Sequence, residues 1–179
     1  MNIIIDTNKI NEKYIFYNDP VENTILKHGE FIKIHYSNSD ININNIITII
    51  HLKHAKISKS FNKVLYEFNH EENKQNLDTI YTLEDNILNK YIKQKNLTSR
   101  KIHSMYNLLK SNNLKLYFTK PIEYIDSTKI ILKISGLWTH DNTIGIIFKC
   151  LPYETYELHG NLQSSDVKLA FIDRKLYTK

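Results

Sequence analysis

Lysine side chains recur at alternate positions of five short apolar runs, where a β-strand would turn them away from the core. In a strand, successive side chains point to opposite faces, so a lysine between apolar neighbours reaches the face that they avoid. These lysines are Lys33, Lys53, Lys115, Lys133 and Lys149. Phe31, His35 and Tyr117 share the outward parity in their own runs. The pattern predicts a sheet face that carries both cations and aromatic rings.

Such a face has one characteristic chemistry, the binding of single-stranded nucleic acid. Lysines neutralise phosphates, and exposed rings stack on unpaired bases for about 1–3 kcal/mol per base, without sequence preference. The charge distribution favours the same partner: residues 98–179 hold 12 basic and 7 acidic side chains, whereas residues 1–97 hold 12 of each. Between Asp85 and Glu123 there is no carboxylate, yet Arg100 and Lys101 lie there. The alternative is a lysine-rich solvated face, because alternation places polar residues on the wet side of any sheet.

Trp138 is the only tryptophan and lies in the run KIILKISGLWTHDNTIGIIFK. Its parity matches Ile130, Leu132 and Ile134, which predicts burial in the core. A β-bulge at Gly136 would reverse that parity and turn the ring outward. The sequence leaves both positions open for Trp138.

Metal binding and catalysis have weaker support in the sequence. His51 and His54 are three residues apart, so on a strand they face opposite sides, and no Cys or His pair elsewhere supplies further zinc ligands. There is no glycine-rich phosphate loop, no GxSxG elbow and no Cys–His constellation. We therefore expect a protein that is not an enzyme and needs no cofactor or metal, while an enzyme with an unrecognised site remains an alternative.

Cysteine usage and hydropathy indicate an intracellular protein. Cys150 is the single cysteine, which rules out an intramolecular disulfide and is typical of a reducing compartment. The N-terminal residues lack the charged and apolar regions of a signal peptide. No stretch has the 18 or more apolar residues of a membrane span, so no membrane partner is expected.

Two types of periodicity indicate the elements that would hold these residues. Period-two runs predict strands at 2–5, 14–17, 30–36, 46–57, 64–68, 114–118, 129–138 and 144–151, with weaker ones at 155–158 and 167–172. The polar stretch 69–78 reads as a loop. Apolar residues at helical spacing predict helices at about 79–95, capped by Asp78 or Thr79, and from Thr98 to about 112. The segment THDN, 139–142, reads as a hairpin turn.

The order of the elements, in which a helical insertion at 79–112 lies between two groups of strands, predicts an α+β, mostly β fold. We expect an OB-like barrel or sheet with a two-helix insertion, formed by residues 1–151, with 152–179 as a strand-rich extension packed on the same domain. A generic α+β sandwich is the structural alternative. A winged helix-turn-helix is a further alternative, in which Arg100, Lys101 and Lys110 lie on the second helix.

The run LKISGLWTHDNTIGIIFK, with LEDNILNKYI and LKLYF before it, resembles a pattern in small proteins of large AT-rich DNA viruses. Some of these are similar to phage-type OB-fold single-stranded DNA-binding proteins. The resemblance covers about residues 77–151 and implies a viral replication or recombination accessory, with Lys133, Trp138 and Lys149 in the strongest matching segment. It also implies replication proteins as partners and leaves homo-oligomerisation open. The chain ends in DRKLYTK, whereas that family usually ends in an acidic recruiting tail, so recruitment by that route is in doubt.

The first hypothesis is therefore a single-stranded nucleic-acid-binding protein, and the second is a virion or scaffold protein whose basic face is merely solvated. The residues expected to bind nucleic acid are Phe31, Lys33, His35, Lys53, Arg100, Lys101, Lys115, Tyr117, Lys133, Trp138 and Lys149.

Overall fold

The computed structural model describes residues 3–24, 27–117 and 124–154, and it is mostly β with two α-helices. The α+β, mostly β class expected from the sequence is confirmed. In chain order the elements are the 3-10 helices η1 (Thr7–Lys9) and η2 (Glu12–Tyr14), β1 (Ile15–Tyr17), β2 (Val21–Glu22), β3 (Gly29–Ser37), β4 (Asn42–Asn44), β5 (Ile46–His51), β6 (Lys56–Ser60), β7 (Lys63–Glu67), α1 (His70–Lys95), β8 (Arg100–Ile102), α2 (Ser104–Leu109), β9 (Asn113–Tyr117), β10 (Ile125–His140) and β11 (Thr143–Glu154).

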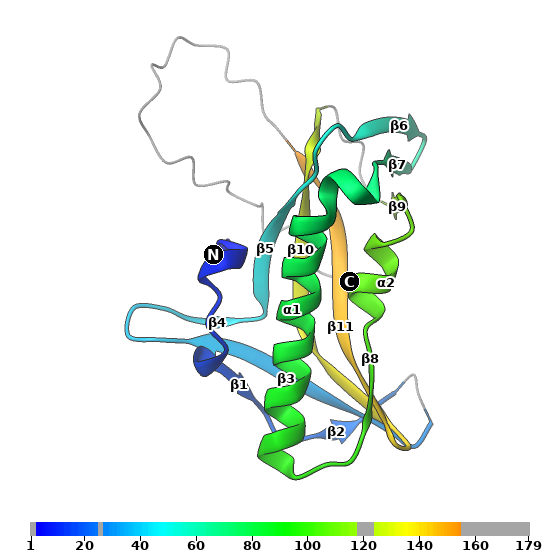
Figure 1. Ribbon diagram of the computed structural model, residues 1–179. Coiled ribbons are helices and arrows are strands. Elements are labelled where there is room, and N and C mark those ends of the chain that lie inside the picture. Colours follow the sequence, from blue (N-terminus) through cyan, green and yellow to red (C-terminus); the bar gives the residue numbers. More distant parts are fainter. Residues whose placement is uncertain (1–2, 25–26, 118–123, 155–179) are drawn as a thin grey trace.

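The large sheet is organised around β10, which is 16 residues long (Figure 1). One edge of β10 pairs antiparallel with β11. The other edge is shared, because residues 129–134 pair with β5 and residues 136–140 pair with β3. The register between β10 and β11 shifts between Ile134 and Gly136, which marks a bulge at that point. Asp141, in the turn that joins β10 to β11, has φ 50°, and the THDN turn is where the sequence predicts it.

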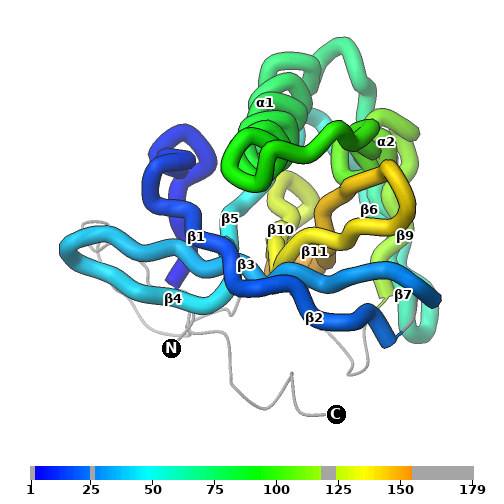
Figure 2. The backbone as a smooth tube through the Cα atoms, turned by 90° about the horizontal axis from the view of Figure 1, so that it is seen from below, coloured from blue at the N-terminus to red at the C-terminus, as the bar shows by residue number. Residues whose placement is uncertain are grey.

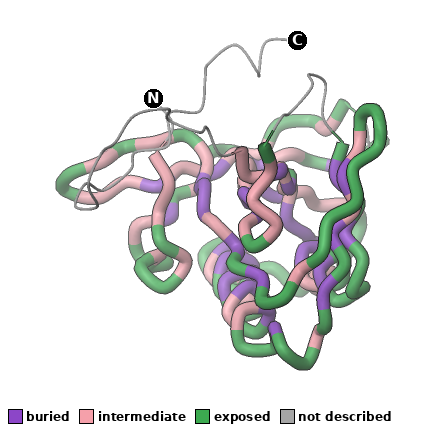
Figure 3. The backbone as a smooth tube through the Cα atoms, turned by 90° about the horizontal axis from the view of Figure 1, so that it is seen from above, coloured by how far each residue is buried: buried purple, intermediate pink, exposed green. Residues whose placement is uncertain are grey.

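Helix α1 lies across one face of this sheet, and both helices lie on the same side of β10 and β11 (Figures 1 and 2). The side of α1 that meets the core buries Leu77, Ile80, Leu83, Ile87, Leu88 and Tyr91. The opposing core side chains of the sheet include Ile32, Ile34, Ile50, Ile130 and Leu132. Figure 3 shows that the buried segments gather in the interior, while exposed residues dominate the hairpin ends.

Helix α1 begins at His70 rather than near residue 79, so the loop predicted at 69–78 is helical. Asn69 caps it, because its side chain accepts hydrogen bonds from the backbone N–H groups of Glu71 and Glu72. The negative charges of these two carboxylates also interact favourably with the positive end of the helix dipole. The helix ends at Asn96, which adopts the left-handed conformation with φ 51°.

The second helix, predicted from Thr98 to about 112, is present but much shorter. Residues 100–102 form β8 instead, which pairs parallel with the start of β11, and α2 covers only Ser104–Leu109. The reason lies in tertiary structure, because the buried side chain of Glu84 on α1 accepts hydrogen bonds from the N–H groups of Met105 and Tyr106 and so fixes the first turn of α2.

A separate three-stranded sheet is formed by β6, β7 and β9 in that order. Val64, Tyr66, Leu114 and Leu116 point from it into the common core. The single strand predicted at 46–57 is thus divided into β5 of the large sheet and β6 of the small one. Residues 3–6 form no strand, although the N–H of Ile5 donates to the carbonyl of Ile47 at 2.8 Å. The weaker strands predicted at 155–158 and 167–172 lie outside the described residues.

No helix in the described part of the chain combines the length and apolarity that crossing a bilayer requires.

Candidate functional site

The face of the large sheet that points away from α1 is the candidate site, and we call it the outer face. Its central members are taken from the residues that alternate with core positions on β3, β5, β10 and β11. They are Phe31, Lys33, Ile47, Ile49, Ile131, Lys133, Gly136, Trp138, Gly145, Ile147, Lys149 and Leu151. Within this set the two rings lie at the β3 end of β10, most aliphatic residues gather toward β5, and Lys133 and Lys149 lie between them.

The bulge before Gly136 decides where the tryptophan points. After the bulge Leu137 occupies the core, fully buried, and Trp138 falls on the outer face, half-buried. Phe31 of β3 is in register with Trp138, so the two rings come from neighbouring positions of adjacent strands. Trp138 therefore lies on the face opposite to Ile130 and Leu132, because the extra residue of a bulge at Gly136 reverses the alternation.

Both rings lie over glycines. A Cβ atom built on Gly145 would come within 2.7 Å of three atoms of the Trp138 indole, and one built on Gly136 would come 2.6 Å from Cε2 of Phe31. Each ring therefore covers the backbone of a neighbouring strand, where a larger residue would displace it. The glycines recess the two rings against the sheet.

Three lysines accompany the rings on the outer face. Lys33 is in register with Gly136, and Lys133 is in register with the exposed Lys149. Arg100 of β8, also exposed, is in register with Thr143 at the end of the same sheet. Among the described residues, the outward positions of β3, of β5, of β10 from Lys129 onward and of β11 up to Tyr153 include no carboxylate. The charged side chains at these outward positions are therefore all cationic, and Asp126, earlier in β10, pairs with Lys129 at 2.8 Å.

The aliphatic part of the outer face was missed by the sequence analysis. Ile131 and Ile47 are only 7% and 6% exposed, yet they lie outside the main core, and Ile49 and Leu151 beside them are half-buried. The available signal was the near-continuous apolar character of the runs IITII and KIIL, which is typical of strands buried on both faces.

The predicted residues do not all lie on this face, although the sequence pattern predicts that they share one sheet face. Lys115 and Tyr117 lie on β9 in the small sheet. Lys53 follows β5, where its backbone N–H donates to Oδ1 of Asn73 on α1 at 2.7 Å, on the helix side of the molecule. His35 has the outward parity but lies toward β4, with its Nδ1 3.5 Å from Oδ1 of Asn44.

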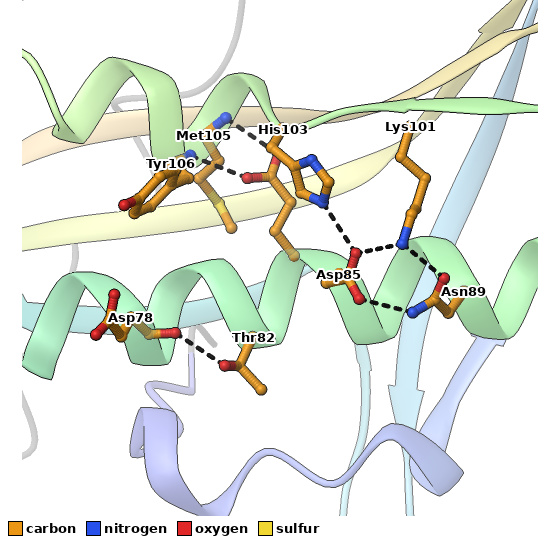
Figure 4. A network of polar contacts seen from close by, with 9 residues as sticks. Asp78, Thr82, Asp85, Asn89, Lys101, His103, Met105 and Tyr106 are labelled. Atoms are coloured by element: carbon orange, nitrogen blue, oxygen red, sulfur yellow. Dashed lines mark hydrogen bonds and ion pairs between the residues drawn. The ribbon is translucent and has the colours of Figure 1, made fainter.

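Lys101 is withdrawn from the surface by a polar network (Figure 4). It is in register with the inward Ile144, and its Nζ donates to Oδ1 of Asp85 on α1 at 2.5 Å. Nε2 of His103 lies 2.9 Å from the same oxygen, and Nδ2 of Asn89 donates to the other oxygen at 2.7 Å. The network ties β8 to α1 and engages the Lys101 ammonium with Asp85 and Asn89 of the helix.

The two carboxylates in this region respond to burial in opposite ways. For Asp85, partial burial alone would raise the pKa, but hydrogen bonds from Lys101 and His103 outweigh it, and the pKa lies below its ordinary value. For Glu84, burial raises the pKa, and the hydrogen bonds from the backbone of Tyr106 and Met105 offset this only in part. Glu84 is fully buried and serves as the cap of α2.

The histidines do not form a metal site within the described residues, which contain no cluster of three His, Cys, Asp or Glu side chains suited to a metal ion. His51 ends β5, and His54 follows in a turn with φ 51° and pairs with Glu72 at 2.9 Å. A shallow groove of about 740 Å³ lies between η1 and α1, lined by side chains of both charges, among them Lys53, Glu72 and Asp78. Its mixed charge favours no single class of ligand.

Comparison with known proteins gives no relative: no family model, no curated protein sequence and no solved structure matches the chain.

Proposed function

We propose that the protein binds single-stranded nucleic acid on its outer face and carries out no catalysis. Phe31 and Trp138 would stack on unpaired bases, while Lys33, Lys133 and Lys149 would face the phosphates. The observation that carries the proposal is the bulge before Gly136, which turns Trp138 to the outer face beside Phe31. A tryptophan in the core could not contact a ligand.

The magnitudes are sufficient for a useful affinity. Two stacked bases contribute about 2–6 kcal/mol at about 1–3 kcal/mol each. Neutralising three phosphates on a single strand gives a slope of about −2 for log K against log salt, since each contributes about −0.7. At about 0.1 M salt that slope is worth about 3 kcal/mol, so the total is about 5–9 kcal/mol. This corresponds to dissociation constants from about 0.2 mM to the micromolar range, which begins at about 8 kcal/mol.

Two more specific proposals are that the ligand is DNA and that the protein acts beside replication proteins. They rest on the resemblance of residues 77–151 to viral and phage OB-type proteins. Two features support the comparison: strands precede and follow α1, and the helix covers one face while the opposite face carries the rings. The large sheet is open, with β1 and β8 at its ends, so the proposal does not depend on a closed barrel.

The test is a titration of a fluorescein-labelled oligothymidine of about 20 nucleotides, a length that exceeds the 4–16 nucleotides that one such domain covers. We expect affinity to fall between about 50 and 200 mM salt with the slope above. Because Trp138 is the only tryptophan, its emission should be quenched on binding. Trp138→Leu should weaken binding at least about fivefold, the equivalent of one lost stack.

A matched pair of charge variants separates the outer face from general basicity. Lys149→Gln removes an exposed charge from the outer face, and Lys95→Gln removes one from the end of α1. Only Lys149→Gln should lower affinity and flatten the salt dependence. Absence of binding at about 50 mM salt, or equal effects of the two variants, would remove the proposal.

The aliphatic part of the outer face favours a second candidate, a protein-interaction or scaffold role. Ile47 and Ile131 are nearly buried outside the main core, and Ile49 and Leu151 extend that apolar area. Light scattering during size-exclusion chromatography distinguishes this role. A dimer that Ile49→Lys dissociates, with no oligonucleotide bound by either protein, would favour the scaffold function.

A further inference from the structure

The hairpin of β6 and β7 holds a phenylalanine entirely in solvent. Phe61 is 98% exposed in the turn between the strands, within the sequence KSFNK. Its ring makes no contribution to the core, and neighbouring Ser60 and Asn62 are also exposed. A large apolar side chain in such a position has no structural explanation in the folded chain.

A second exposed ring and two lysines lie on one face of the same small sheet. Lys63 of β7 is in register with Tyr117 of β9, which is 61% exposed, and Leu65 is in register with Lys115. We call this surface the arm face; it consists of Phe61, Lys63, Leu65, Lys115 and Tyr117. The only carboxylate in β6, β7 and β9 is Glu67, which lies opposite Lys56 at the far end of the hairpin from Phe61.

The opposite side of the small sheet is anchored. Val64, Tyr66 and Leu114 are fully buried and Leu116 nearly so. In a strand, these residues alternate with Lys63, Leu65, Lys115 and Tyr117, so their packing fixes the direction in which the arm face points. The strand part of the arm face, formed by β7 and β9, is therefore preorganised, whereas the ring of Phe61 in the turn would be ordered on binding.

We propose that the arm face is a second contact for single-stranded nucleic acid, separate from the outer face. Phe61 and Tyr117 stack on unpaired bases, and Lys63 and Lys115 hold the phosphates between and beside them. The inference rests on the proposed function for the identity of the ligand, and it adds a binding surface on a different sheet. It also gives a place to Lys115 and Tyr117, which lie away from the outer face.

The order of residues favours a nucleic acid over an anionic bilayer. From the tip inward, the arm face presents an aromatic ring, a lysine beside a second ring, and then a second lysine. A single strand alternates bases with phosphates and matches this order. A bilayer would favour several large apolar residues together at the tip with cations behind them, whereas the tip here has Phe61 alone between Ser60 and Asn62.

Photo-crosslinking reads the two surfaces independently in the full-length protein. A thymidine oligomer of about 30 nucleotides with bromodeoxyuridine in place of thymidine is irradiated with the protein, and the products are digested with nuclease and trypsin; this length exceeds the site of one domain. Phe61 lies in the tryptic peptide 60–63 and Trp138 in the peptide 134–149. We expect crosslinks in both peptides.

Affinity measurements with Phe61 variants give the second readout. Phe61→Leu keeps an apolar side chain but removes the ring, and should weaken binding of the long oligomer about fivefold or more, while Phe61→Trp should restore it. Because Phe61 is almost fully exposed, neither variant should change the unfolding midpoint. Leu97→Ala, an exposed apolar residue after α1, is the matched control and should bind normally.

The outcomes separate this inference from the proposed function. A crosslink in 134–149 with none in 60–63, together with normal binding by Phe61→Leu, overturns the arm contact alone. A crosslink in 60–63 with normal binding by Trp138→Leu overturns the outer face alone. If vesicles of phosphatidylcholine and phosphatidylserine bind in a Phe61-dependent way while oligonucleotide binding does not depend on Phe61, the arm face is a membrane contact instead. If the protein binds no oligonucleotide at all, both proposals are overturned.

Discussion

Replacement of Gly136 by alanine tests how closely β10 approaches β3 at the bulge. A Cβ atom at this position would lie 2.4 Å from the carbonyl oxygen of Ile32 and 2.6 Å from Cε2 of Phe31. No described glycine has positive φ, so the effect of alanine comes from space and not from backbone conformation. The oxygen belongs to the backbone, so it cannot move without shifting β3.

The size of the effect follows from the overlap. Ordinary contact begins at 3.4 Å, so β3 must move by about 1 Å or its hydrogen bonds to β10 must distort. Overpacking of this kind costs about 1–3 kcal/mol, and the lower entropy of unfolded alanine returns only about 0.4–1 kcal/mol. A net loss of about 1–2 kcal/mol lowers Tm by about 2–8 °C in a chain of this size.

Gly145→Ala is the matched comparison. The three atoms nearest its Cβ would all belong to the Trp138 indole, at 2.6–2.7 Å, and a side chain on the outer face can move aside. We expect a smaller loss of stability and a shift of the Trp138 emission. Urea and thermal unfolding followed by circular dichroism measure both variants. Wild-type stability in Gly136→Ala, or a larger loss in Gly145→Ala, would refute the packing argument.

Four further predictions concern hydrogen-bonded carboxylates of α1 and the buried thiol of β11. Glu84→Ala should destabilise the fold by about 2–5 kcal/mol in urea titrations, because it leaves two backbone N–H groups without an acceptor, at about 1–3 kcal/mol each. Asp85 has a lowered pKa, so the stability that it contributes is complete at neutral pH and is lost as pH falls through the folded-state pKa. Asp85→Asn should therefore lower stability at pH 7 and flatten the acid limb of the curve, whereas an unchanged limb would contradict the network's role. Burial raises the pKa of Glu84, so its effect on stability has the opposite sign. The ionised carboxylate is unfavourable in the folded protein, and stability should rise as pH falls toward 4.5 and the group is protonated. Glu84→Gln should abolish this pH-dependent part of the stability. Burial raises the pKa of the Cys150 thiol to about 12, so Ellman's reagent should react with it only after unfolding, and fast reaction of the native protein would show that the strand opens.

The strand pattern was largely predictable because alternation is a local property. The runs at 30–36, 129–138 and 144–151 correspond to β3, β10 and β11. The start of α1 was not predicted, because its first two turns bury only Asn73 and Leu77 and so show little apolar periodicity. The signal that was present is Asn69 followed by Glu71 and Glu72, an N-cap with acidic residues in the first turn.

The site depended on facts that no local pattern contains. Lys101 resembles an available cation in sequence, but Asp85 binds it from another element. Lys115 and Lys149 have the same parity relative to their own apolar neighbours, yet their strands belong to different sheets. The face on which Trp138 lies depends on the position of the bulge, since one extra residue reverses the side of every residue after it.

The shared edge of β10 also has a consequence for the order of events during synthesis. The strands β3 and β5 both pair with β10, which follows them by roughly half the chain length, and β8 pairs with β11. Until the ribosome has released the β10–β11 hairpin, the isoleucine-rich β5 lacks the neighbour that covers its backbone groups. A nascent chain in that condition presents an unpaired, apolar strand edge, which is the form most prone to associate with other chains. We therefore expect truncation before residue 140 to yield aggregates and not a smaller folded unit.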